Sequence, residues 1–218
     1  MTFTKTMISL CLMSATFLPA FAHASMDGDL LNIQREWGRI NYQVSGKDAK
    51  LQAIHELEKS AAQLSAANPN RAEPMIWEGI ILSTDAGIVK SMSALGIVKK
   101  AKGLLEKAIQ TNPDALDGSA QASLGVLYYQ VPGWPVSFGD DKKAEKYLQD
   151  ALKINPNGID PNYFYGDFLL KAKRYDEAVP YLTKALQAPA RPNRPVADAG
   201  RRAEVKQALA KAQAGSHK

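Results

Sequence analysis

Apolar residues in three segments of the chain follow the spacing of an amphipathic helix. In residues 144–152 they fall at positions i, i+3, i+4, i+7 and i+8, which lie on one face of an α-helix. The same pattern recurs in 101–109 and 178–186. The three copies are followed by Pro113, Pro156 and Pro189. Proline cannot continue a helix and disfavours helical geometry in the residue before it, so the pattern predicts three helices with a built-in stop.

The prolines also define a repeat. Pro69 and Pro113 are 44 residues apart, and Pro113 and Pro156 are 43 apart, within the range of stacked helical hairpins. A second apolar stretch precedes each helix and contains Gly79, Gly125 or Gly166. Glycine inside a helix costs about 0.5 to 1 kcal/mol relative to alanine, so its recurrence needs a packing reason. We expect the paired helix to approach closely at each of these glycines.

Leu124-Gly125-x2-Tyr128, followed by Ala144-x3-Leu148 and Pro156, resembles the pattern of the tetratricopeptide repeat family. The resemblance implies an all-α fold, a right-handed solenoid of stacked antiparallel helix pairs with capping helices at both ends. Compared with the family unit, the spacing from glycine to alanine is lengthened in two of the repeats. We therefore expect insertions at residues 84–100 and 130–140, of which the first is apolar enough to form a short packed helix.

The expected organisation has four parts. Residues 1–24 form a signal peptide, 25–69 a helical pair, 70–190 three hairpins, and 191–218 a capping helix with a tail. The last part carries four arginines, Arg191, Arg194, Arg201 and Arg202. Charge clusters near chain ends are usually solvated, but some bind anions, so both interpretations stay open.

The first segment has the features of an export signal. Lys5 supplies a positive start, residues 7–18 are mostly apolar, and Ala22-His23-Ala24 fits a signal-peptidase site. The apolar run is well short of the roughly 20 residues that span a bilayer, so we expect cleavage rather than a membrane span. The protein is then periplasmic in a Gram-negative bacterium and secreted otherwise.

Few residues suggest chemistry. The single cysteine, Cys11, leaves with the signal segment, and His55 and His217 do not have ligand spacing, so we expect no metal site, cofactor or catalytic residue. Asp140 and Asp141 are better explained as a helix N-cap than as a cation site. The formal net charge of +5 is mild, and we expect no nucleic-acid partner.

The loop of the second insertion is the most distinctive segment. Its prolines and glycines forbid a helix, and Trp134 and Phe138 either fold back over the groove between hairpins or contact a partner. On the next hairpin, residues 163, 167 and 170 share one helical side. We hypothesise a continuous partner-binding site with Asp167 as its single polar selector, formed by Tyr129, Trp134, Phe138, Tyr163, Asp167 and Leu170.

These features favour a non-catalytic exported scaffold that binds a protein or peptide on its concave helical surface. The chain also loosely resembles the T-component proteins of tripartite periplasmic transporters. That resemblance implies a homo-oligomer that docks a periplasmic substrate-binding protein. The alternative is a small-molecule carrier that uses the aromatic loop around Trp134.

Overall fold

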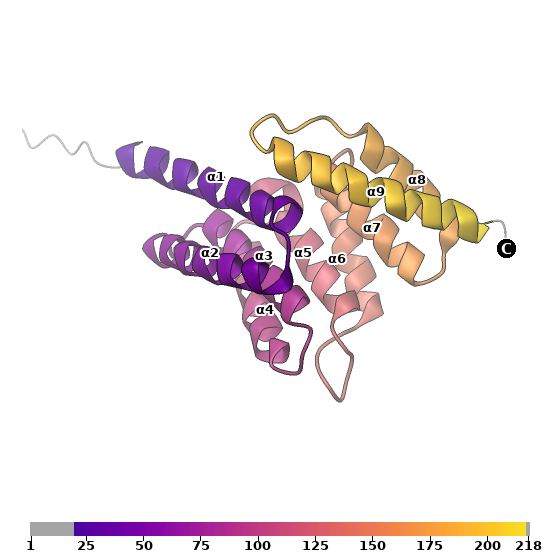
Figure 1. The fold of residues 1–218 in the computed structure, drawn as a ribbon, viewed down its shortest axis with the longest axis horizontal. Helices are drawn as coiled ribbons and strands as arrows, with labels where there is room; N and C mark the ends of the chain where they lie inside the picture. Colours follow the sequence, from indigo (N-terminus) through magenta and orange to yellow (C-terminus); the bar gives the residue numbers. More distant parts are fainter. Residues whose placement is uncertain (1–19, 217–218) are drawn as a thin grey trace, which may run out of the picture.

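A computed structural model describes residues 20–216, with side chains from Met26 onward. These residues form an all-α solenoid with no strand (Figure 1). The elements are α1 (Ala20–Gln43), α2 (Lys47–Ala67), α3 (Ala72–Val89), α4 (Ala94–Thr111), the 3-10 helix η1 (Ala115–Gly118), α5 (Ser119–Gln130), α6 (Asp141–Ile154), α7 (Ile159–Lys171), α8 (Tyr175–Gln187) and α9 (Pro195–Ser216). Most of the predicted signal segment lies outside the described residues.

Three hairpins, α3–α4, α5–α6 and α7–α8, form the body of the solenoid. The two expected insertions differ in structure. Residues 84–100 lengthen both helices of the first hairpin, because α3 runs on to Val89 and α4 begins at Ala94. Residues 130–140 form an irregular loop between α5 and α6.

A repeated seam of small and branched residues joins the helices of each hairpin. Leu105, Leu148 and Leu182 are fully buried. A Cβ atom added to Gly125 would lie 2.6 Å from Cγ of Leu148, and Gly79 and Gly166 face Leu105 and Leu182 in the same way. The expected close approach at these glycines is confirmed.

Side-chain amides fasten successive hairpins to each other. Nε2 of Gln121 donates to the carbonyl of Pro113 at 2.8 Å, and Nδ2 of Asn162 donates to the carbonyl of Pro156 at 2.9 Å. Both amides come from the first helix of the next hairpin. The proline stop therefore also offers a carbonyl that sets where the next hairpin begins.

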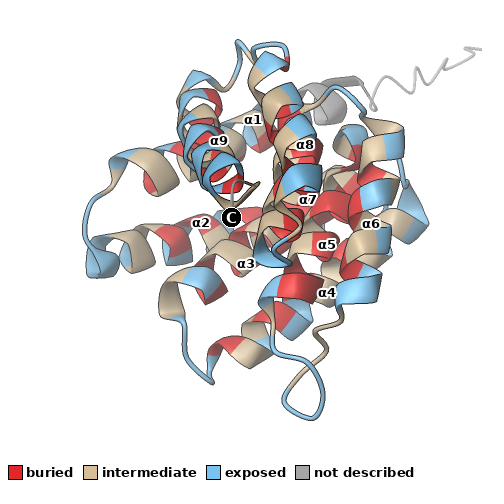
Figure 2. Cartoon of the chain, turned by 90° about the vertical axis from the view of Figure 1, so that its right-hand side faces the viewer, coloured by how far each residue is buried: buried red, intermediate tan, exposed pale blue. Residues whose placement is uncertain are grey.

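The terminal helices contact each other as well as covering the ends of the stack. The helices α1, α3, α5, α7 and α9 contact one another in this order, and α9 also contacts α1. We call these five helices the inner ring. Figures 1 and 2 both show α1 and α9 side by side. The surface that an open solenoid would leave as a groove is closed here by the two ends of the chain.

Tight packing and two long-range hydrogen bonds hold α1 against α9 and the connection that precedes it. A Cβ atom on Gly38 would lie 3.2 Å from Cβ of Ala197. Nε of Arg35 donates to the carbonyl of Asn193 at 2.9 Å, and the hydroxyl of Tyr42 donates to Glu204 at 3.2 Å. Among the described residues, no helix is both long and apolar enough to cross a bilayer.

Candidate functional site

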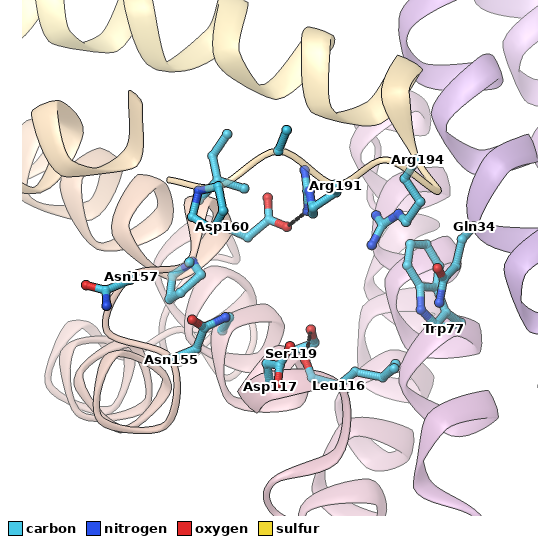
Figure 3. A pocket seen from close by; sticks show the side chains of 16 residues that line it. Gln34, Trp77, Leu116, Asp117, Ser119, Asn155, Asn157, Asp160, Arg191 and Arg194 are labelled. Atoms are coloured by element: carbon cyan, nitrogen blue, oxygen red, sulfur yellow. Dashed lines mark hydrogen bonds and ion pairs between the residues drawn. The ribbon is translucent and has the colours of Figure 1, made fainter. Parts of the chain in front are cut away.

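A pocket of about 340 Å³ lies within the inner ring (Figure 3). Four helices of the ring, α1, α3, α5 and α7, line its wall together with the connection that precedes α9. The polar and aromatic part of the wall includes Gln34, Trp77, Asp117, Asp160, Arg191 and Arg194. They are drawn together from both ends of the sequence, so the closure between α1 and α9 creates this site.

Asp160 provides the fixed negative charge of the wall. Its carboxylate accepts from Nη1 of Arg191 at 2.5 Å and from Nε of Arg201 at 2.8 Å. Burial alone would raise the pKa of Asp160, but Arg201 and Arg191 outweigh it and hold this pKa at about 2. The carboxylate is therefore ionised at neutral pH. Its contribution to stability is present above about pH 4 and is lost as the pH falls towards 2.

Three of the four arginines are bound within the fold. Arg201 stacks on the rings of Tyr163 and Phe164, with its guanidinium carbon 4.6 and 4.7 Å from the ring centroids. Arg191 and Arg202 each donate to Asp198 at 2.9 Å. These side chains do not form the solvated cap considered for the sequence, because they tie the α8–α9 connection and α9 to α7 and α8.

Arg194 is different. Its guanidinium carbon lies 4.9 Å from the ring centroid of Trp77, and its Nε atom is buried without a hydrogen-bond partner. In residues 26–216 no carboxylate forms an ion pair with it. Burial, followed by the neighbouring charge of Arg191, lowers the pKa of Arg194 to about 10, so it remains a cation at neutral pH. The pocket thus presents one guanidinium with unused donors.

The floor of the pocket includes a short segment with an unusual backbone. Leu116 and Asp117 have φ values of 50° and 55°, in the left-handed region that non-glycine residues rarely adopt. Such residues cost about 1 to 3 kcal/mol each and persist where the surrounding structure holds them. Leu116 packs against both hydrophobic clusters of the protein, which supplies that support.

The structure brings together only part of the predicted aromatic site. The hydroxyl of Tyr129 donates to Asp167 at 2.6 Å, and Tyr129 is buried. Tyr163 lies on α7, as Asp167 does, but its ring faces Arg201. Leu170, also on α7, is partly buried against the core. Asp167, the predicted polar selector, is therefore already hydrogen-bonded to Tyr129 within the fold.

The two aromatic residues of the α5–α6 loop, Trp134 and Phe138, have different environments. Phe138 folds back onto Tyr128, with ring centroids 5.5 Å apart and planes at 83°. Trp134 is 90% exposed. Phe138 therefore packs within the fold, while Trp134 is available for contact with a partner. The six residues of the predicted binding site do not form one continuous surface.

The residues of the pocket were partly visible in the sequence. The arginine cluster is an anion-binding candidate from the sequence alone, but no sequence pattern connects Gln34 or Trp77 with it. Their proximity depends on contacts between segments more than a hundred residues apart, as the bond from Arg35 to Asn193 illustrates. Asp140 accepts from the backbone N–H of Lys143 at 3.1 Å, which confirms its N-cap role.

Comparisons with known proteins agree with this architecture. Residues 137–199 match the family model described as tetratricopeptide repeat. A tetratricopeptide repeat protein of Thermus thermophilus, TTC0263, has 18% identity and a TM-score of 0.57, with 87% of this chain and 93% of that chain covered. These findings support a likeness of this chain to tetratricopeptide repeat proteins. At this identity the likeness to the solved structure concerns the fold alone.

Two further solved structures match this chain with lower TM-scores. MamA AMB-1 has 20% identity and a TM-score of 0.44, covering 84% of this chain and 98% of that one. The pilF protein of Pseudomonas aeruginosa has 15% identity and a TM-score of 0.35, covering 88% and 90%. At these scores neither structure bears on the function of this chain. No curated protein matches the sequence.

Proposed function

We propose that the protein is a non-catalytic exported scaffold or adaptor that binds a protein or peptide partner at the inner ring. Proteins of this fold generally act as interaction scaffolds, and solenoids bind partners on the surface that their first helices line. In this chain that surface is reduced to the pocket and its mouth. The partner then enters as a short segment or a protruding side chain rather than as a long helix.

The unused guanidinium of Arg194 is the observation that carries the proposal. An arginine presents up to five N–H donors in a planar fork that matches a carboxylate. Trp77 holds this fork from one side, so little side-chain freedom is lost when an anion binds. We therefore propose that an acidic side chain or terminal carboxylate of the partner docks on Arg194.

Export and transporter association rest on separate features of the sequence. Export depends on residues 1–24, and transporter association depends on the loose resemblance to T-component proteins, which the comparisons do not support. A small-molecule carrier built on the aromatic loop is less favoured. Ligand sites usually enclose most of their ligand, whereas Trp134 stands in solvent and Phe138 packs against Tyr128.

Matched capture experiments test this function. The chain from Ser25 onward is immobilised and exposed to proteins of the exported compartment in three forms: unaltered, Arg194→Gln and Lys184→Gln. Lys184 is exposed on α8 and supplies a control with the same charge change. We expect at least one protein to be retained by the unaltered chain and by Lys184→Gln but lost with Arg194→Gln. Identical sets of captured proteins for all three would contradict the proposal.

A further inference from the structure

Three large apolar side chains are exposed in the described part of the chain, and all three lie on hairpin connections. Trp134 is 90% exposed, Met92 is 72% exposed and Val136 is 48% exposed. Met92 belongs to the α3–α4 connection, and the other two belong to the α5–α6 loop. Figures 1 and 2 both show these connections projecting from the same end of the molecule. We call residues 90–93 and 131–140 together the tip surface.

The α5–α6 loop is held in shape by its own backbone and by one anchor. The N–H of Gly139 donates to the carbonyl of Pro132 at 3.0 Å, and the N–H of Val136 donates to that of Gly133 at 3.0 Å. A Cβ atom on Gly139 would lie 2.0 Å from the carbonyl oxygen of Val131, so the loop closes only with glycine there. With Phe138 packed against Tyr128, this arrangement holds Trp134 outward.

Lysines surround the tip surface. Lys90, Lys99 and Lys142 are exposed, and within residues 26–216 none of them forms an ion pair or a side-chain hydrogen bond. Lys143 lies 5.6 Å from the ring centroid of Tyr128. Two acidic residues, Asp140 and Asp141, are also present, and Asp140 caps α6, but they offset only two of the four lysine charges. The balance around the apolar side chains is positive.

We infer that the tip surface docks onto an anionic lipid surface. Tryptophan is favoured at the interface between lipid and water, where its ring is buried and its N–H stays hydrated. Lysines close to an anionic leaflet each add attraction of about 1 kcal/mol. The tip surface combines the two features on protruding turns. This inference is independent of the pocket and of the partner proposed for it.

The shape favours a lipid over a protein as the occupant. Stable protein interfaces bury roughly 800 Å² per partner, with their aromatic anchors in the centre of a packed patch. Here the apolar side chains sit at the ends of two separate turns, with lysines around them. A deformable lipid surface can receive both turns at once, whereas a protein would need two matching cavities.

Vesicle binding tests the inference with the unaltered chain from Ser25. The probes are vesicles of phosphatidylglycerol and phosphatidylcholine, and vesicles of phosphatidylcholine alone. We expect co-sedimentation with the anionic vesicles only, together with a blue shift of tryptophan emission. Trp37 is half-buried and Trp77 is buried, so the shift reports on Trp134. Trp134→Ala should weaken partitioning about tenfold, because interfacial binding scales with the apolar area buried and Trp134 is the largest exposed apolar side chain of the tip surface. Unchanged partitioning would overturn the inference.

Charge variants separate a specific surface from general attraction. The triple variant Lys90→Glu, Lys99→Glu, Lys142→Glu should lose binding to anionic vesicles. The matched triple variant Lys107→Glu, Lys184→Glu, Lys206→Glu has the same net charge and alters exposed lysines away from the tip surface. It should retain most of the binding, while circular dichroism shows equal helicity for both. Equal losses of vesicle binding in the two triple variants would overturn the inference. The inference would also be overturned if the unaltered chain does not bind vesicles and Trp134→Ala instead abolishes capture of a protein.

Discussion

The hairpin seams and the contact between α1 and α9 hold the molecule together in different ways. Along the seams, buried leucines meet glycines of the paired helix, and the same arrangement occurs three times. Between the chain ends, close packing of Gly38 on Ala197 and of Gly200 on Tyr42 is combined with single polar contacts, such as the bond from Tyr42 to Glu204, and this arrangement is not repeated. The seams therefore supply repeated apolar stability, and the closure supplies a site that the repeats alone do not form.

This difference between the seams and the closure indicates where a functional site lies. Repeated seams are similar in every unit, so they distinguish one part of the solenoid little from another. The closure occurs once and places Arg194 beside Trp77 and facing the wall that contains Asp160. A polar network is a weak source of stability but a strong source of geometry, because each buried charge needs its partner in a defined place.

Removal of Arg201 is expected to have the largest effect on stability. Arg201→Ala leaves Asp160 with one arginine fewer and exposes the faces of Tyr163 and Phe164. Breaking a buried ion pair costs about 3 to 5 kcal/mol, and we expect a loss near 3 because Arg191 remains. Denaturant unfolding measures it. The control Arg174→Ala, at a partly exposed pair with Glu145, should lose less than about 1 kcal/mol, and similar losses for the two variants would contradict this account.

A substitution in the seam should have the next largest effect. Gly125→Leu places a side chain where a Cβ alone would lie 2.6 Å from Leu148. Overpacking of this kind costs about 1 to 3 kcal/mol. Gly96→Leu is the control, because Gly96 is an exposed helical residue with nothing within 4 Å of its Cβ position. Thermal unfolding should show a lower melting temperature for the first variant and an equal or higher one for the second.

A smaller, pH-dependent effect on stability is expected at Glu58, which belongs neither to the hairpin seams nor to the contact between α1 and α9. Burial, followed by the charge of Asp85, raises the pKa of Glu58 to about 7, while His55 and Lys100 oppose this shift. A raised carboxyl pKa contributes stability that is fully present below the ordinary value near 4.5 and is lost as the pH rises through 7. The melting temperature should therefore fall between pH 5 and 8.

The Glu58→Gln variant isolates that contribution. Its melting temperature should depend less on pH over the same range, because glutamine does not titrate. Glu56→Gln is the matched control, since Glu56 forms an exposed pair with Lys59 on the same helix. Parallel pH profiles for the unaltered chain and Glu58→Gln would show that another group governs the dependence.

The seams could be predicted because their cause is local. The spacing of Ala144, Leu148 and Ala151 indicates a helix face, and the recurrent glycine indicates a close partner helix within the same repeat. The pocket could not be predicted in this way. Arginines near a chain end signal charge, but a pattern along the sequence does not show that Arg194 meets Trp77. The aromatic hypothesis grouped Trp134 with Asp167, and the structure pairs Asp167 with Tyr129 instead.

The central claim is that the partner enters the inner ring and meets Arg194. Its most direct test places a photoreactive phenylalanine analogue at Gln34, which lines the pocket, or at Gln110, which is exposed on α4. After irradiation with proteins of the exported compartment, we expect a cross-linked product from position 34, none from position 110, and loss of the product when Arg194→Gln is added. A product from position 110 alone, or one from position 34 that survives Arg194→Gln, would contradict the claim.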